Sequence, residues 1–318
     1  MHNAIAAIPS VDAQIAALDG AVRDSLLHTR AVATRTAQAS DLRRFAAFAA
    51  SLGLDATDAT TAARYLAHLD AQGAATATIR RHASSLQTCI PSTAHPAVTA
   101  LLDGITRARA AKGAAPQRQA AALAPATLAT MLRTQPATLA GLRTRALLLL
   151  GFTLGCRESE LVALSVADLA VDAQRGLLVT IRHGKTDQLG LGRLAVVPYG
   201  RQGACPVTAV REWLQAAGIT HGPVLRSVSR HGTVGDALST RAVDSILQAA
   251  ADAAGIQQHL TGHSLRSGFV TAAYNAGVPE ADIMRQTGHR SVASLRRYRR
   301  TLDAWQSNAA APVLQAIR

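Results

Sequence analysis

The sequence predicts a mainly α-helical chain with a small antiparallel β-sheet, divided into two domains. The length of 318 residues exceeds that of one small domain and suits two of ordinary size. Hydrophobic residues make up 48% of the chain but aromatic residues only 3%. Alanine and leucine must therefore do most of the packing, and both are strong helix formers. Helical periodicity gives way to β-branched runs in one region only, near residues 177–198.

The first domain, residues 1–110, is expected to be a bundle of four or five helices. We predict helices over 40–53, 58–73, 76–90 and 97–110. Ser40 and Asp58 are suitable N-caps for the first two, and Gly53 and Gly73 are suitable stops. In the third helix Ile79 and its helical neighbours form an apolar face, and polar residues lie off that face. These polar residues are Arg80, Arg81 and Ser84.

Residues 111–125 have few large apolar side chains, two prolines and a glycine, so we assign them to an interdomain linker. The second domain, 126–318, resumes with helices from Thr127. Its longest uncharged apolar run, 146–156, is too short to cross a bilayer and predicts a buried helix. Two β-branched runs, 177–182 and 193–198, predict an antiparallel hairpin. After Cys205 we expect helices to the end of the chain.

Charge and cysteine usage narrow the class of protein. The net charge of +13 and the pI of about 11.1 favour a polyanionic partner, most often nucleic acid. Cys89, Cys156 and Cys205 are odd in number and far apart, which indicates neither a zinc site nor a disulfide framework. Together with a start that lacks the layout of a signal peptide, this favours the reducing cytoplasm.

The two lysines among 33 basic residues are Lys112 and Lys185. Arginine keeps its proton at any working pH, whereas lysine releases one when its pKa is lowered. Lys112 lies in the expected linker, and we interpret it as a charge that is either solvated or in contact with a phosphate. Lys185 follows the first strand of the hairpin, where it could reach into a groove as a proton donor. An ordinary exposed loop lysine is the alternative.

Three further pairings carry chemistry. Arg157 and Glu160 are three residues apart at a helix start, and His263 and Arg266 are three apart on a helix that begins near Ser264. His289 precedes Tyr298 by nine residues. Each has an ordinary alternative, namely a surface salt bridge, a capping histidine beside an exposed arginine, or a tyrosine that caps a basic helix.

Taken together, these residue types form a full set for phosphoryl transfer without a metal. Two arginines can clamp the oxygens of a phosphodiester, and two histidines can hydrogen-bond it and manage a proton. A lysine can protonate the departing hydroxyl, while a tyrosine attacks phosphorus. Tyr65 and Tyr274 read as packing residues, and Tyr199 ends a strand. Tyr298, among five arginines, is the preferred nucleophile.

The order of these residues resembles that of the tyrosine recombinase (phage integrase) family, from about residue 25 to the end. The matching stretches are GCRESELVAL, RHGKTD, TGHSLRSGF, IMRQTGHRSVASLRRY, LRRFAAF and TIRRHASSLQ. VSRHGTVGDALSTRAVDSIL is also similar to the corresponding part of Cre recombinase. Cre has a tryptophan where this chain keeps the commoner histidine, His289.

The resemblance implies a role for each residue. Arg157 and Arg266 would bind the scissile phosphate, with His263 and His289 assisting there. Glu160 would support the geometry of the site. Lys185 would protonate the 5′-hydroxyl, and Tyr298 would form a 3′-phosphotyrosyl bond that a partner strand resolves. No cofactor is implied.

The family fold implies a C-shaped clamp on double-stranded DNA, with a helical core-binding domain and an α+β catalytic domain. The resemblance also implies that Arg80, Arg81 and Ser84 contact a DNA groove or the DNA backbone. Arg241 would be a candidate for contacting base edges. The resemblance further implies a homotetramer on two sites, with room for an accessory protein. Two alternatives stay open, a type IB topoisomerase and a non-catalytic DNA-binding regulator. The apolar tail at 313–317 would dock on a neighbouring subunit or pack within its own chain.

Overall fold

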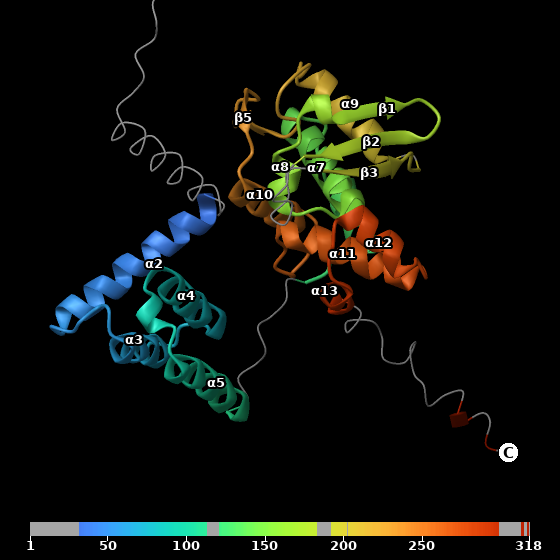
Figure 1. The fold of residues 1–318 in the computed structure, drawn as a ribbon. Coiled ribbons are helices and arrows are strands. Elements are labelled where there is room, and N and C mark those ends of the chain that lie inside the picture. Colours follow the sequence, from blue (N-terminus) through green and yellow to red (C-terminus); the bar gives the residue numbers. More distant parts are fainter. Residues whose placement is uncertain are drawn as a thin grey trace, which may run out of the picture. The chain divides into compact units, whose positions relative to one another are not determined.

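A computed structural model describes residues 32–112, 121–182, 192–201, 203–298, 313–314 and 317. The chain divides into two compact units, Met1–Arg118 and Gln119–Arg318, called here the first and the second unit (Figure 1). Each is described by itself. No helix within these described ranges has both the length and the apolarity that crossing a membrane requires.

The first unit is a helical bundle. Its elements are α2 (Val32–Ser51), α3 (Ala59–Ala71), α4 (Thr76–Cys89), the 3₁₀ turn η1 (Pro91–Thr93) and α5 (Pro96–Ala111). Phe45, Leu66 and Ile79 meet in its core, where Tyr65 is also buried as expected. The four predicted helices are thus all present.

The termini of these helices follow the sequence signals in all but one case. The Asp58 side chain accepts from the backbone N–H of Thr61, and Gly73 follows α3 with a φ of +75°. The prediction that Ser40 caps the first helix is wrong, because α2 starts at least eight residues earlier, at Val32. The intervening residues are mostly alanine, threonine and other residues a helix tolerates, so nothing ends the helix before Ser40.

A buried polar network joins three helices of the first unit. The carboxylate of Asp41 on α2 is 1% exposed and accepts two bonds from Arg81 Nη1, at 2.7 and 2.8 Å. Ser85 Oγ donates to it at 2.8 Å, and His82 Nε2 lies 3.3 Å away. His82 Nδ1 in turn lies 3.1 Å from the Tyr65 hydroxyl on α3. Arg81 is therefore held in place while its side chain stays 46% exposed.

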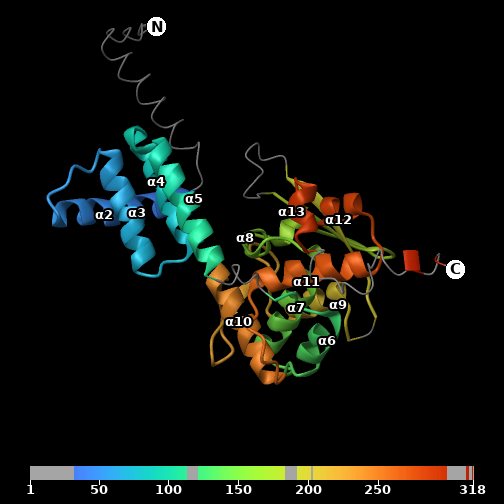
Figure 2. The same ribbon diagram turned by 90° about the horizontal axis from the view of Figure 1, so that it is seen from below.

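The second unit contains eight α-helices and one 3₁₀ turn in its described residues, together with two small sheets. The helices are α6 (Pro125–Arg133), α7 (Leu139–Leu154), α8 (Glu158–Val162), α9 (Pro206–Ala216), α10 (Thr240–Ala253), α11 (Gly262–Asn275), α12 (Glu280–Thr287) and α13 (Val292–Arg296), plus the 3₁₀ turn η2 (Val166–Asp168). Figures 1 and 2 both show α11 packed along α7.

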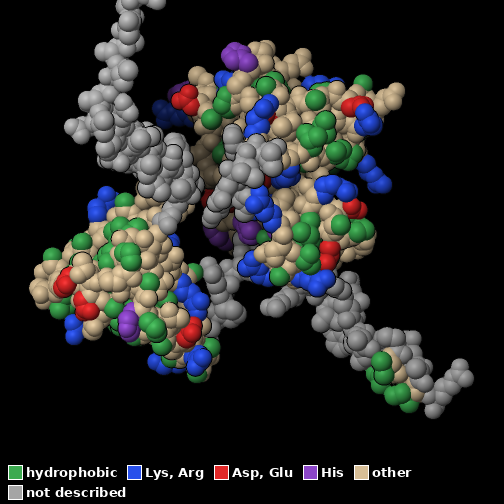
Figure 3. Space-filling model, in the orientation of Figure 1, with side chains coloured by type: hydrophobic (Ala, Val, Ile, Leu, Met, Phe, Trp, Pro, Cys, Tyr) green, Lys and Arg blue, Asp and Glu red, His purple; other side chains and the backbone are tan. Residues whose placement is uncertain are grey.

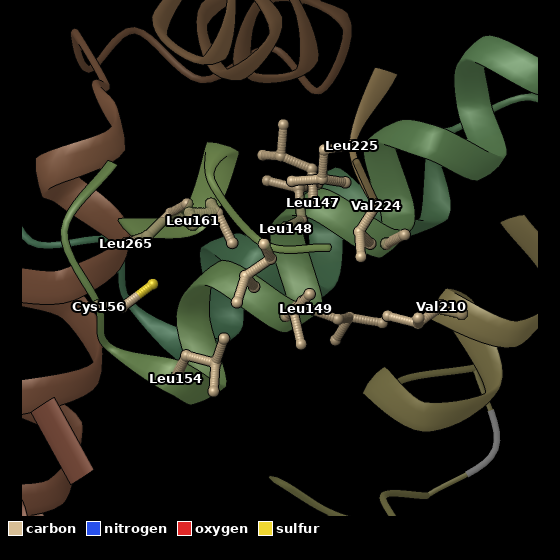
Figure 4. Packing of buried hydrophobic residues seen from close by; sticks show 14 of the residues in the cluster. Leu147, Leu148, Leu149, Leu154, Cys156, Leu161, Val210, Val224, Leu225 and Leu265 are labelled. Atoms are coloured by element: carbon tan, nitrogen blue, oxygen red, sulfur yellow. The ribbon is translucent and has the colours of Figure 1, made fainter. Parts of the chain in front are cut away.

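The expected buried helix is α7, the centre of the second unit's core. Leu147, Leu148 and Leu150 are completely buried. Figure 4 shows leucines from α7, α8 and α11 converging on this core. Gly151 permits the contact, since a Cβ there would lie 2.8 Å from Leu265 and 2.9 Å from Leu161. The start of α8 and the start of α11 are thereby fixed against one helix.

The predicted hairpin is confirmed as β2 (Gly176–Ile181) and β3 (Arg193–Pro198), paired antiparallel with Ile181 opposite Arg193. An additional strand, β1 (Leu169–Asp172), completes a sheet of order β1-β2-β3. The expectation of helices alone after Cys205 is wrong, because β4 (Arg226–Val228) pairs with β5 (Val234–Ala237). These strands have three and four residues, too few for an alternating pattern to show in the sequence.

The segment expected to link the domains ends inside the second unit. Leu123 is completely buried, and its backbone N–H donates to the Ser264 carbonyl at 3.1 Å. Gly268 on α11 allows this approach, since a Cβ there would lie 2.2 Å from the Leu123 carbonyl oxygen. Leu123, which lies within the expected linker, is therefore packed against α11.

The Asp41 network yields a test of the first unit. We expect Asp41→Ala to lower the free energy of unfolding by about 1–3 kcal/mol, because it leaves buried His82 and Ser85 without their acceptor. Chemical denaturation followed by circular dichroism measures this. Asp103→Ala removes an exposed carboxylate 3.6 Å from Arg80 and should change little. Equal effects of the two substitutions would show that the buried network does not stabilise the bundle.

Candidate active site

The site begins where α7 ends. Gly155 closes α7 in the left-handed conformation, with a φ of +52°. A Cβ at this position would lie 2.7 Å from Phe269 and 2.8 Å from Thr287. Only glycine fits such a conformation in such a space. The chain therefore turns sharply out of the core and places Arg157 at the N-cap of α8.

Glu160 is a buried carboxylate shared by two arginines. Its side chain is 1% exposed and accepts from Arg157 Nη1 at 2.6 Å and from Arg193 Nη2 at 3.0 Å. It also accepts from the backbone N–H of Arg157 at 3.2 Å. The reading of Arg157 and Glu160 as an ordinary surface salt bridge is therefore wrong. A carboxylate in this position fixes the directions of both guanidinium groups.

Arg266 is the most deeply buried cation of the site, at 3% exposure on α11. Its Nη1 donates to two backbone carbonyls, Gly155 O at 2.8 Å and Thr287 O at 2.6 Å. Burial, and then the charge of Arg157, lowers the pKa of Arg266, while Tyr298 and Glu160 act in the opposite direction. Arg266 and Arg157 thus lie close enough for their positive charges to interact. Two guanidinium groups at such a distance can bind the same anion.

Tyr298 faces both histidines. Its hydroxyl lies 3.2 Å from His263 Nε2, and the centroid of its ring lies 6.1 Å from that of His263 and 5.8 Å from that of His289. The contact with His289 is edge-on. The ring of Tyr298 packs against a small core formed by Val270, Ile283 and Leu295. The phenol oxygen is thus positioned by a packed ring and a histidine.

His289 is the second histidine of the site, and its environment keeps it neutral. Burial, followed by the charges of Arg266 and Arg157, lowers its pKa to about 3. The pKa of His263 is lowered as well, by burial and then by Arg266. The Nδ1 atom of His289 lies 2.6 Å from the hydroxyl of Thr287. Both rings are therefore neutral near pH 7, so they can accept protons.

Arg193 is a site residue that the sequence analysis missed. It opens β3, and its Nη1 donates to the Gln286 carbonyl at 2.5 Å. Gly288 makes room for it, since a Cβ there would lie 2.6 Å from Arg193 Nε. An arginine at the start of a hairpin strand normally faces solvent, so its sequence position carried no signal.

The other predicted residues lie elsewhere or are not described. Lys185 falls in 183–191, outside the described residues. Arg80 and Ser84 are exposed on α4, where Arg80 Nη2 donates to Thr106 at 3.1 Å. Arg241 is exposed in the first turn of α10. In the described ranges, no group of three or more His, Cys, Asp or Glu side chains could hold a metal ion.

The basic segment around Tyr298 is only partly available for contacts. Arg296 is paired with Glu280 at 3.0 Å, and Arg297 donates to Ser294 at 3.1 Å. Of the other three arginines in this segment, Arg290 is exposed, and Arg299 and Arg300 lie outside the described residues. On the face of the second unit shown in Figure 3, basic side chains lie next to histidine side chains.

The shared carboxylate provides a test of the site's architecture. We expect Glu160→Gln to lower the free energy of unfolding by about 1–3 kcal/mol, because Arg157 and Arg193 then lose their shared counter-charge at nearly unchanged side-chain volume. Urea denaturation measures it. Asp282→Asn, which breaks an exposed pair with Arg285, is the control and should leave the midpoint nearly unchanged. An unchanged free energy of unfolding for Glu160→Gln would contradict the role of Glu160 in holding Arg157 and Arg193.

The neutral histidines predict a pH dependence. The unfolded chain protonates a histidine near pH 6.5, whereas folding lowers the pKa of His289 to about 3. The stability that this group contributes is therefore complete above about pH 6.5 and is lost as the pH falls toward 3. We expect His289→Gln to make the free energy of unfolding fall less steeply between about pH 7 and pH 5. His221→Gln, at an exposed position, should keep the wild-type slope; identical slopes for all three proteins would contradict the prediction.

Comparison with known proteins places this geometry in a family. Residues 122–304 match the model of the phage integrase family. The chain is 38% identical over 174 residues to an integrase/recombinase XerD homolog of Selenomonas ruminantium, covering 54% of this chain and 51% of the relative. It is 31% identical over 161 residues to tyrosine recombinase XerC of Xanthomonas campestris, covering 50% and 44%. The chain thus spans about half the length of the curated relatives it matches.

Solved structures show the same fold at low sequence identity. XerH site-specific recombinase bound to palindromic difH substrate superimposes with a TM-score of 0.55 at 16% identity, covering 81% of this chain and 72% of that one. A lambda integrase tetramer bound to a Holliday junction gives 0.54 at 16% identity, covering 86% and 74%. The family model covers more than half of the chain, and its range includes both Lys185 and the six residues of the predicted set that the structure brings together. The chain belongs to the phage integrase family of tyrosine recombinases.

Proposed function

We propose that this protein is a site-specific DNA recombinase that cleaves and rejoins strands through a 3′-phosphotyrosyl intermediate. The observation that carries the proposal is the position of the Tyr298 hydroxyl, 3.2 Å from His263 Nε2, in the same site as Arg157 and Arg266. A nucleophile, a proton acceptor and two fixed cations are what an attack on a phosphodiester needs. Family membership supports the same activity.

In the proposed cleavage step, the phenol oxygen of Tyr298 attacks phosphorus, and its proton passes to His263 Nε2. The new bond joins this oxygen to phosphorus, and the bond from phosphorus to the 5′-oxygen breaks. Arg157 and Arg266 offset the charge on the non-bridging oxygens. The leaving 5′-oxygen takes a proton from Lys185, a role that the family resemblance implies for a residue outside the described ranges. Rejoining reverses these steps with the 5′-hydroxyl of a partner strand.

DNA binding is proposed to use both units. Most of the affinity should come from phosphate contacts of a chain with a net charge of +13, and should fall with salt. In the first unit Arg81, held by Asp41, would meet a phosphate with little loss of side-chain freedom. Arg80 and Ser84 would contact a groove or backbone beside it, and Arg241 would read a base edge.

Assembly as a homotetramer on two DNA sites is the proposed active state. The lambda integrase neighbour is a tetramer bound to a Holliday junction, which supports this by analogy of fold. The exposed apolar side chains Val313, Leu314 and Ile317 offer a short docking segment. A type IB topoisomerase would use the same chemistry as a monomer. A regulator would need no proton acceptor 3.2 Å from the tyrosine, so the contact disfavours it.

The covalent intermediate can be tested with DNA of random sequence. A library of nicked random duplexes is incubated with the protein, and DNA that stays attached in detergent is recovered. We expect wild type to trap a defined sequence and Tyr298→Phe to trap none, because the nucleophilic oxygen is missing. Tyr274→Phe, which removes a hydroxyl bonded to Glu280 at 3.1 Å, is the matched control and should trap DNA.

Absence of an adduct with wild type would refute the enzymatic proposal and favour a regulator. A plasmid carrying two copies of the trapped sequence then separates the two enzymes. We expect recombined products from a recombinase. Relaxation of the supercoiled plasmid without recombined products would identify a topoisomerase instead.

A further inference from the structure

Thr287 lies at the junction of α12 and the segment that carries His289, and it is completely buried. Its backbone carbonyl accepts from Arg266 at 2.6 Å. Its side-chain hydroxyl makes two contacts, with the Ile283 carbonyl at 2.6 Å and with His289 Nδ1 at 2.6 Å. One residue thus touches both an arginine and a histidine of the site.

The Thr287 hydroxyl has one proton, so it can donate a hydrogen bond to only one of its two partners, the Ile283 carbonyl and His289 Nδ1. A carbonyl oxygen has no proton, so the single hydroxyl proton of Thr287 is donated to Ile283. Toward His289 the same oxygen can then only accept. The contact at 2.6 Å therefore requires a proton on Nδ1 of the ring.

The charge of the His289 ring decides whether its second nitrogen, Nε2, carries a proton or a lone pair. The groups that act on His289 are Arg266 and His263 from α11, Arg157 from the start of α8, and Arg193 from β3, with the ring of Tyr298 edge-on. Burial and these cations hold the pKa of His289 at about 3, so the ring is neutral and has a single N–H. Because that N–H is on Nδ1, Nε2 carries a lone pair.

We propose that Thr287 is a positioning residue that locks His289 in the Nδ1–H tautomer, so that Nε2 serves the site as an acceptor. This inference rests on the proposed function for its role in the reaction, but the tautomer is a property of the free protein. In that protein His289 cannot donate from Nε2 to a phosphate oxygen. It becomes a donor there only after taking up a proton, while Nδ1–H stays bonded to Thr287.

The tautomer is measured directly by long-range proton–nitrogen correlation spectra of the ¹⁵N-labelled full chain without DNA. His289→Gln assigns the signals. We expect wild type at about pH 7.5, well above the pKa of the ring, to show a protonated Nδ1 and an unprotonated Nε2. Thr287→Ser keeps the hydroxyl and should match it. Thr287→Val has nearly the same shape without the hydroxyl and should shift the ring toward the Nε2–H form. A wild-type ring with an unprotonated Nδ1, or a Val variant identical to wild type, would overturn the inference.

The role in the reaction is tested by the rate of adduct formation on the trapped duplex. We expect Thr287→Val to be slower on the order of 10- to 100-fold, with Ser restoring most of the rate, because an Nε2–H ring would place a donor where the site holds an acceptor. Thr144→Val is the matched control, since Thr144 is also buried and bonds the carbonyl four residues back, at 2.8 Å. It should keep the wild-type rate.

The two proposals fail in different ways. A wild-type chain that forms no adduct refutes the proposed function, and the spectra alone then decide the tautomer. A Thr287→Val protein with the altered tautomer but an unchanged adduct rate refutes the positioning role and leaves the function standing. The spectra separate a positioning role from a purely structural defect, because such a defect would lower the rate while leaving the proton on Nδ1.

Discussion

The site depends on one buried interaction, the donation of Arg266 Nη1 to the carbonyls of Gly155 and Thr287. Gly155 is the C-cap of α7, and Thr287 is the last residue of α12. Helix C-termini expose carbonyls that the helix itself cannot pair, and they carry partial negative charge. A buried guanidinium satisfies both ends at once. Arg157 stands two residues after the first carbonyl and His289 two residues after the second, so the same contact fixes the origin of both side chains.

Two glycines with left-handed backbone make this joint possible. Gly155 and Gly288 have φ values of +52° and +70° and directly follow α7 and α12. A side chain at the first would strike Thr287, and one at the second would strike Arg193. The close approach lets Arg193 bond the Gln286 carbonyl and Glu160 together. The strand β3 is thereby tied to α8 and α12, which places the start of this strand at the edge of the site.

The sequence predicted most of the helices, the main hairpin and six of the residues that converge on the site. Those predictions rest on local signals, such as the Asp58 cap, and on residue types with distinctive chemistry. It failed where a local signal was ambiguous and where a tertiary contact decides the outcome. Ser40 is an acceptable cap in isolation, yet α2 continues through it because the preceding residues are compatible with a helix. Arg193 and Thr287 are ordinary residues at ordinary positions, and only folding brings a carboxylate to one and an imidazole to the other. Strands as short as β4 and β5 have no period to detect.

Burial, and after it the balance of charge in the site, lowers the pKa of both histidines and so keeps them neutral. The site holds three guanidinium groups: Arg157 and Arg193 share the buried carboxylate of Glu160, and Arg266 donates to two backbone carbonyls. The excess positive charge is available to an anion, and because arginine does not lose its proton it does not vary with pH. The same excess opposes protonation of His263 and His289. The site therefore divides two tasks between two residue types: arginines supply a constant positive charge, and neutral imidazoles supply lone pairs. An incoming phosphate would reduce the positive field at the rings, so anion binding and proton uptake are physically coupled in this arrangement.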